Sequence, residues 1–217
     1  MKHKFPRIAH CPWSENVSDD DKLHPNMSVF EGQEVIGTVK MDGECTTIAP
    51  EYIHARSLEY PPHESRTWMK QFWNIMKSDI PQDYQISGEN LYAKHSIHYH
   101  HLKSFFYVFT IWNDKDCALS WEETKKWCDL LDLTPVPEFY RGVFDRYQIH
   151  TIFDEYCEHS KDPIEGYVIR LLGEIPFSEC DKNRCLKSMC KWVRKDHVTT
   201  DEHWMTQPVI PNELEKT

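Results

Sequence analysis

Short runs of β-favouring residues follow one another in the first half of the chain, with a single helical pattern between them, and this order limits the folds open to it. The runs cover residues 34–40, 44–49, 52–57, 84–93 and 104–112. Several are joined by connections too short for a crossover helix, so successive strands are expected to pair as β-hairpins. The order therefore predicts antiparallel sheets rather than regular βαβ alternation.

The helical pattern between these runs covers residues 65–80. Its apolar side chains recur at the spacing of one helix face. They are Trp68, Met69, Phe72, Trp73, Ile75 and Met76. We expect this stripe to be part of the core.

The second half of the chain adds helices and strands in mixed order. Ser120 and Glu123 form a capping box, which predicts the start of a helix over residues 121–133. A further helix is predicted over 145–159, and strands over 165–172 and 188–195. The predicted fold class is α+β, with antiparallel sheets and helices on their outer faces.

The first 30 residues are polar and contain three prolines and the acidic run Asp19–Asp21, so we expect an irregular N-terminal segment. Residues 31–217 are expected to form one domain, because no repeat or Gly/Ser-rich linker divides them. Hydrophobic residues make up 40% and aromatic residues 13% of the chain, which excludes a disordered protein.

Cellular location and cysteine state follow from absences in the sequence. No apolar run approaches the roughly 20 residues of a membrane span, and the N-terminus lacks the apolar stretch of a secretory signal. We expect a soluble, cytoplasmic protein without a membrane partner. The 8 cysteines include no C-x-x-C pair and fit no compact disulfide framework. Free thiols are therefore expected, with a metal site as the less favoured alternative.

The charge pattern is uneven. The net charge of −10 counts against an extended nucleic-acid surface, because proteins that bind nucleic acid cover phosphates with many Lys and Arg. In residues 180–197, however, Lys and Arg far outnumber Asp. Such a basic strip can hold a polyphosphate or a segment of nucleic-acid backbone.

Lys40 ends the first β-like run and is followed by Asp42, Gly43 and Glu44. Free lysine titrates near 10.4 and is not nucleophilic at neutral pH. Partial burial and a nearby cation can lower its pKa. Taken alone, the pattern fits either a surface hairpin or a nucleophile that attacks a phosphorylated ligand.

Other strand positions carry complementary groups. Glu89 and Glu165 lie beside glycines on predicted strands, and the last predicted strand carries Lys191 and Arg194. Phe109 is the preferred base-stacking aromatic, with Phe106 or Tyr107 as alternatives. An aromatic ring for the base, carboxylates for ribose or a divalent metal, and cations for phosphates together suit a nucleoside triphosphate.

Four segments in order, KMDGE, GENLYAKHSIHY, EGYVIR and KWVRKDHV, resemble the motifs of the covalent nucleotidyltransferase superfamily of ligases and mRNA-capping enzymes. The RNA ligase family is the most similar within it, over about residues 34–205. The resemblance implies a nucleotidyltransferase (ATP-grasp-like) adenylylation domain. No block of about 70 residues remains for the separate OB-fold or helical module that such enzymes usually carry, so a protein partner that replaces it is a further expectation.

The resemblance implies an ATP-dependent RNA ligase that uses Mg²⁺ or Mn²⁺. Lys40 would form a lysyl–AMP adduct, AMP would pass to a 5′-phosphate on RNA, and a 3′-hydroxyl would displace it, as in RNA repair. Two alternatives remain open. One is another polynucleotide ligase or a capping-type nucleotidyltransferase, and the other is a non-catalytic subunit that binds RNA ends.

The resemblance also assigns roles to single residues. Lys40, Glu165 and Lys191 would be catalytic, with Glu165 as the metal-organising carboxylate and Lys191 on the α-phosphate. The nucleotide-binding set would be Lys40, Asp42, Gly43, Arg56, Glu89, Phe109, Glu165 and Lys191. The RNA-binding set would be Arg56, Arg194 and Lys195. Two positions depart from the family pattern: Thr110 replaces an aspartate that usually follows the stacking aromatic, and Cys45 replaces a common asparagine.

The histidines of residues 95–102 form the remaining conspicuous cluster. On a strand, His98 and His100 would share a face, but the run contains no Cys, Asp or Glu to complete a metal site. Contacts to phosphate or RNA, or plain surface histidines, are preferred to a transition-metal site.

Overall fold

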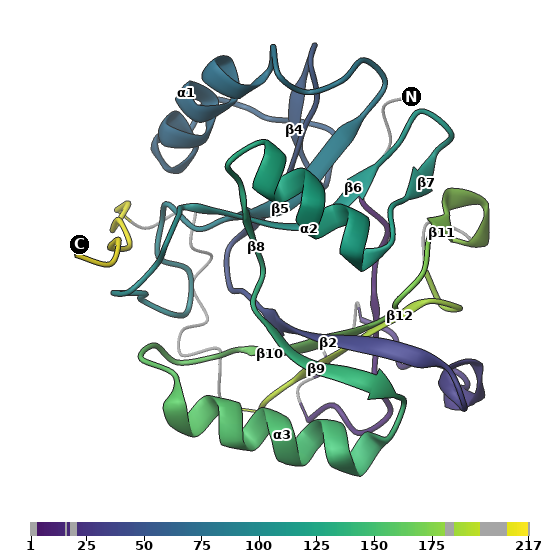
Figure 1. Cartoon of the computed structure of the whole chain (residues 1–217). Coiled ribbons are helices and arrows are strands. Elements are labelled where there is room, and N and C mark those ends of the chain that lie inside the picture. The colour runs from purple at the N-terminus through teal and green to yellow at the C-terminus, as the bar shows by residue number, and fades with distance from the viewer. Residues whose placement is uncertain (1–3, 16, 18–20, 181–184, 196–207, 217) are drawn as a thin grey trace.

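The computed structural model describes residues 4–15, 17, 21–180, 185–195 and 208–216. Two β-sheets form the body of the protein, with α3 on the outer side of one sheet and α1 and α2 on the outer side of the other (Figure 1). This is the predicted α+β architecture of antiparallel sheets flanked by helices. Within the described residues, no helix is long and apolar enough to cross a membrane.

The first sheet has five strands. Its order is β1 (Ala9–His10), β12 (Met189–Val193), β10 (Gly166–Leu171), β2 (Glu34–Lys40) and β9 (Glu138–Val143). All neighbouring pairs are antiparallel except β1 and β12. Val35 to Val39 on β2 are all buried, because this strand lies inside the sheet and is covered on both faces.

The second sheet lies beneath α1 and α2. Its order is β11 (Ile175–Pro176), β7 (Cys117–Ala118), β6 (Phe106–Trp112), β5 (Gln85–Asn90), β3 (Glu44–Ile48) and β4 (Ile53–Ala55), with β8 (Thr134–Pro135) beside β6. Only residues 41–43 separate β2 of the first sheet from β3 of the second. The chain therefore passes from one sheet to the other directly after Lys40.

Three α-helices complete the fold of the described residues. They are α1 (Thr67–Met76), α2 (Trp121–Leu130) and α3 (Arg146–His159), with 3₁₀ turns at Met27–Phe30, Glu64–Arg66 and Phe177–Glu179. The predicted cap of α2 is confirmed, since the Ser120 side chain accepts a hydrogen bond from the Glu123 N–H. The Asp145 side chain caps α3 in the same way, by accepting from the N–H groups of Tyr147 and Gln148.

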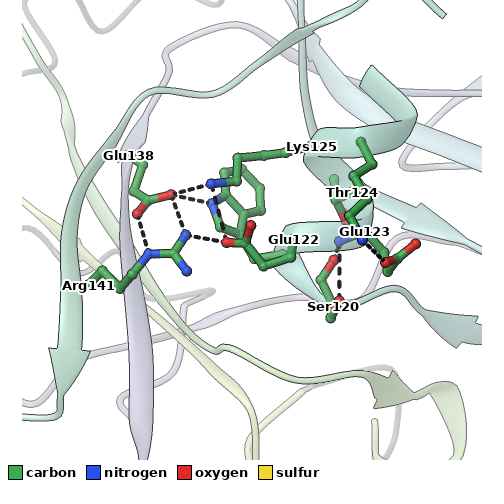
Figure 2. Close-up of polar contacts among 9 residues, drawn as sticks. Ser120, Glu122, Glu123, Thr124, Lys125, Glu138 and Arg141 are labelled. Carbon is green, nitrogen blue, oxygen red and sulfur yellow. Dashed lines mark hydrogen bonds and ion pairs between the residues drawn. The ribbon is translucent and has the colours of Figure 1, made fainter. Parts of the chain in front are cut away.

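Figure 2 shows how polar side chains join α2 to the edge strand β9. The Glu138 carboxylate accepts hydrogen bonds from Trp121 Nε1 at 2.6 Å and from Arg141 Nε at 2.8 Å. Arg141 also forms an ion pair with Glu122 on α2 at 2.5 Å. Isolated exposed pairs contribute little, but a network that shares one carboxylate fixes the orientation of the helix.

Three sequence predictions need correction. Residues 9–10 are not irregular: they form β1 at the edge of the first sheet, because Ala9 and its neighbour pair with β12 across the length of the chain. Ile75 is not core but 74% exposed, although the rest of the α1 stripe packs inward. The histidine run of residues 95–101 is a loop rather than a strand.

The cysteine prediction is wrong for one pair. Cys180 and Cys185 form a disulfide with their Cα atoms 4.1 Å apart. The other six cysteines are free, as expected.

Candidate active site

Lys40 lies at the end of β2, and its ammonium group is 2.6 Å from Glu165 Oε2. The register of the sheet creates this contact, because Lys40 pairs with Gly166, the residue directly after Glu165. A Cβ atom on Gly166 would lie 2.0 Å from the Trp192 carbonyl oxygen. Only glycine therefore allows β10 and β12 to approach so closely beside the lysine.

The electrostatics of Lys40 differ from the sequence expectation of a lowered pKa. Burial acts to lower the pKa of Lys40. The charge of Glu165 opposes it, followed by Glu89 and Asp42, and the pKa rises to about 12. The predicted neighbouring cation, Lys191, is present but is outweighed by three carboxylates. In this state Lys40 is an ammonium ion held by its neighbours.

Asp42 and Gly43 hold the turn that follows Lys40. The Asp42 carboxylate accepts from the N–H groups of Ser96 and Ile97, both at 2.7 Å. The Gly43 N–H donates to Glu89 Oε1 at 3.2 Å, and a Cβ on Gly43 would lie 2.5 Å from a carbonyl oxygen of β5. The two residues thus position the lysine, and direct nucleotide contacts by them stay a prediction.

Glu89 lies opposite Cys45 on β3 and Tyr107 on β6. Burial raises the pKa of Glu89; Lys40 lowers it, whereas Glu165 and Asp42 raise it further, to about 8. Burial and the neighbouring carboxylates thus favour the protonated form of Glu89. Carboxylate oxygens are the ligands that Mg²⁺ and Mn²⁺ prefer, although among the described residues Asp42, Glu89 and Glu165 are not gathered closely enough to form a three-ligand site.

Lys191 lies on the other side of β10 from Lys40, where it pairs with Val168. Burial and the charge of Lys40 lower the pKa of Lys191, and Asp21 opposes this shift. Lys191 Nζ is 3.2 Å from Asp21 Oδ1, and His10 Nε2 is 3.1 Å from Asp21 Oδ2. No local pattern in the sequence indicates that Asp21 reaches this lysine, because the two residues are 170 positions apart.

A cavity of about 840 Å³ opens between these strands. This volume is within the range of small-molecule and cofactor sites, roughly 300–1,000 Å³. Its wall contains many of the predicted residues, namely Lys40, Gly43, Arg56, Glu89, Phe109 and Lys191. The RNA-binding candidates Arg194 and Lys195 follow β12 outside this wall, and Lys195 is exposed.

Phe109 is the aromatic of β6 that reaches the cavity. The alternatives do not: Phe106 is fully buried against Phe72 of α1, and the Tyr107 hydroxyl accepts a hydrogen bond from a loop N–H group. Phe5 packs edge-on against Phe109, with ring centroids 4.8 Å apart. The N-terminal segment therefore forms part of the cavity wall, which the sequence reading missed.

Arg170 is the last residue of the EGYVIR segment. It is a further residue of the cavity wall that was not predicted from the sequence. It lines the cavity while only 2% exposed, and burial lowers its pKa to about 10. Its Nη2 donates to the Leu119 carbonyl at 2.9 Å, whereas its Nη1 has no hydrogen-bond partner among the described residues. A buried guanidinium with a spare donor suits an anionic ligand.

The chain was compared with protein families and curated sequences. The model of the family described as RNA ligase matches residues 33–193. The comparison with curated protein sequences gives no significant match.

Solved structures with a similar fold are known. A putative ATP-dependent DNA ligase from Aquifex aeolicus has a TM-score of 0.56 at 15% identity, with 88% of this chain and 50% of that chain covered. An archaeal ATP-dependent RNA ligase has a TM-score of 0.55 at 15% identity, with 88% and 48% covered. A mutant of the Naegleria gruberi RNA ligase with ATP and Mn has a TM-score of 0.50 at 17% identity, with 87% and 62% covered. The chain thus spans about half to three fifths of these proteins, and the likeness shows a shared ligase nucleotidyltransferase fold.

Proposed function

The chain belongs to the RNA ligase family, and from this premise we propose that it is an ATP-dependent RNA ligase that seals 5′-phosphate and 3′-hydroxyl ends through a lysyl–AMP intermediate. The observation that carries the proposal is the ion pair between Lys40 and Glu165 at 2.6 Å. Lys40 lines the cavity, and so does Lys191 across the neighbouring strand. A protein that only bound RNA would have no use for a half-buried lysine among carboxylates.

In the first step, Lys40 Nζ forms a bond to the α-phosphorus of ATP. The bond from that phosphorus to the bridging oxygen breaks, and pyrophosphate leaves with the electron pair. The Lys40 ammonium must first lose a proton. Glu165 Oε2, its ion-pair partner at 2.6 Å, would accept this proton. Lys191 stabilises the negative charge on the α-phosphate once its contact with Asp21 is exchanged for the ligand.

In the following steps, a 5′-phosphate oxygen of RNA forms a bond to the AMP phosphorus while the P–N bond breaks and Nζ takes up a proton. The RNA 3′-hydroxyl then attacks the activated 5′-phosphorus, and AMP leaves. Arg56 at the cavity wall, with Arg194 and Lys195 beyond it, would contact the RNA backbone.

Glu89 would bind the ribose and Phe109 would stack on the base, since both line the cavity from neighbouring strands. The unpartnered Nη1 of Arg170 adds a candidate phosphate contact. Glu165, with the neighbouring carboxylates, would hold Mg²⁺ or Mn²⁺, in keeping with the Naegleria gruberi structure with ATP and Mn. When bound, the ion would neutralise triphosphate charge. An ion that bound Glu165 would compete with Lys40 for this carboxylate. It would also neutralise the negative charge that keeps Lys40 protonated.

We also propose that a protein partner can contribute the second module that related ligases usually carry. A partner protein that supplies it would affect substrate choice and sealing more than adenylylation. Joining of RNA ends in repair is the process we propose.

The test is to incubate the protein with α-labelled ATP, GTP or labelled NAD and Mg²⁺ and to look for a covalent, acid-labile adduct. We expect label from ATP alone. Label from GTP would favour a capping-type enzyme, and no label from any nucleotide would favour a non-catalytic RNA-end-binding subunit.

The fold likeness to the Aquifex aeolicus protein makes DNA ligation the second candidate. Pre-adenylylated nicks in all-RNA and all-DNA duplexes separate the two. Faster sealing of RNA supports the proposal, and equal or faster sealing of DNA contradicts it.

A further inference from the structure

The C-terminal segment, residues 208–216, lies along the loop of residues 91–104, on the side of the molecule away from α2 (Figure 1). Backbone hydrogen bonds join the two, from Lys94 N to Ile210 O at 2.7 Å and from Glu213 N to Tyr99 O at 2.9 Å. The Asn212 side chain, 3% exposed, accepts from the Tyr99 N–H at 2.9 Å. The contact is therefore a specific one that fixes the register of both segments.

This register brings three ligand-type side chains together. His98 and His100 from the loop and Glu213 from the C-terminal segment each offer one ligand atom, and these atoms all lie within 4.8 Å of one another. The two imidazole centroids are 4.3 Å apart, and His100 Nδ1 is 3.4 Å from Glu213 Oε2. The carboxylate that is missing from the histidine run in the sequence is thus supplied by the end of the chain.

The hydrogen bonds around the cluster orient its donors. His98 Nε2 is 3.1 Å from the Pro211 carbonyl oxygen. Because a carbonyl can only accept, Nε2 carries the proton and Nδ1 keeps its lone pair. A metal-binding histidine commonly donates its second N–H to a carbonyl in this way, which fixes the tautomer.

Asp162 shapes the loop but is not part of the cluster. Its two carboxylate oxygens accept from the N–H groups of His100 and His101, each at 2.9 Å, and the His101 ring is also paired with it at 3.2 Å. His101 is therefore engaged elsewhere, while His98 and His100 face Glu213.

We propose that His98, His100 and Glu213 bind a divalent transition-metal ion, for which Zn²⁺ is the best match. Two imidazoles and one carboxylate are a common zinc ligand set, and a water molecule would complete a tetrahedron. Mg²⁺, which prefers oxygen donors, is disfavoured by the two nitrogens. This site is separate from the carboxylates around Lys40.

The expected effect of the metal is to fasten the C-terminal segment to the loop. The same loop supplies the N–H groups of Ser96 and Ile97 that bind Asp42. Metal binding would therefore stabilise the loop that holds the turn after Lys40. The metal would take no part in the proposed ligation reaction.

The test measures binding of Zn²⁺ by equilibrium dialysis and of Co²⁺ by its visible spectrum, both in excess Mg²⁺ so that oxygen-rich sites are filled. We expect one equivalent of metal, a four-coordinate cobalt spectrum without a thiolate charge-transfer band, and a higher thermal unfolding midpoint with Zn²⁺. His98→Asn and Glu213→Gln should each weaken binding at least about tenfold, whereas His101→Asn should not.

Each alternative result is decisive, because Glu213 is 57% exposed and His98 lies outside the buried core, so replacement of either leaves the core intact. A thiolate band would place the metal on cysteines and overturn the proposal. Equal binding by the wild type and both cluster variants, or no binding at all, would overturn it as well. The outcome is independent of adenylylation.

Discussion

At the scale of single residues, one substitution of Lys40 can remove the proposed nucleophilic amine while it keeps the positive charge. Lys40→Arg keeps a cation opposite Glu165, but a guanidinium stays protonated and is not a nucleophile. We expect the AMP adduct to disappear completely in the assay with labelled ATP. Lys126→Arg, at an exposed lysine of α2, is the matched control and should be labelled like the wild type. Label on the Lys40→Arg protein would rule out Lys40 as the nucleophile.

Glu165 is expected to set the protonation state of Lys40, the proposed nucleophile. Its charge is the largest of the contributions that raise the pKa of Lys40. In Glu165→Gln the pKa of Lys40 should fall, so the residual adenylylation should reach its plateau at a lower pH than in the wild type. The rate itself should drop by about 10²-fold, as expected when one organising charge is removed. A rate–pH profile measures both effects, and an unchanged profile with near-normal rate would contradict the role of Glu165.

Asp21 allows a test of linkage between charge and stability. Its hydrogen bond from His10 and its contact with Lys191 hold the pKa of Asp21 well below its usual range. The carboxylate therefore stabilises the fold above about pH 4, the ordinary value for aspartate, and this stabilisation is lost as the pH falls below it.

The corresponding prediction compares Asp21→Asn with the wild type by thermal unfolding. The variant should unfold at a lower temperature at pH 7, and the difference should shrink as the pH is lowered to about 3. A difference that grows in acid would show that the pair does not exist in solution.

At the scale of elements, the close approach of β10 and β12 is the most sensitive packing feature. A Cβ on Gly166 would meet the Trp192 carbonyl at 2.0 Å, whereas a Cβ on Gly173 would meet nothing within 4 Å. Gly166→Ala should lower the free energy of unfolding by about 1–3 kcal/mol, the usual cost of overpacking, while Gly173→Ala should be close to neutral. Urea unfolding checks both, and equal midpoints for the two variants would contradict the packing argument.

The elements that the sequence predicts correctly carry local signals. Ser120 and the 3.6-residue spacing mark α2, and Asp145 precedes α3. Strands β1 and β9 lack such signals: β1 has two residues, and β9 is an edge strand whose charged side chains Glu138 and Arg141 interrupt the apolar pattern. Their pairing depends on partners far along the chain.

The residues of the candidate site also divide into those that the sequence indicates and those that it does not. Lys40, Glu89, Glu165 and Lys191 are found because each lies in a motif with fixed neighbours. Asp21 and Phe5 are not found, and neither is Glu213 of the separate histidine cluster, because their roles arise only when distant segments meet. The pKa of Lys40 could not be predicted either, since its direction depends on which charges end up nearest.

At the scale of the whole molecule, the proposed function requires an acidic protein to bind an acidic polymer. We expect RNA binding to be weak and moderately dependent on salt, with log K falling by about 0.9 per phosphate neutralised on a duplex as log[salt] rises. Lys195→Ala, at an exposed position after β12, should weaken binding of a pre-adenylylated nicked RNA and make the slope shallower. Lys126→Ala provides a control of equal charge change. Equal slopes for the two variants would show that residues 194–195 do not contact RNA.

The passage of the chain from β2 to β3 has a mechanical consequence. Lys40 and Glu44 are the adjoining ends of the two sheets and are joined by four peptide steps, which reach at most about 14 Å. Packed sheets are about 10 Å apart, so the two layers have almost no freedom to separate at this point. Any widening of the cavity must occur at a distance from residues 41–43, by rotation of one sheet relative to the other about this connection. Lys40, the proposed nucleophile, then lies at the axis of this rotation. A large ligand can enter and leave the cavity while the position of Lys40 hardly changes.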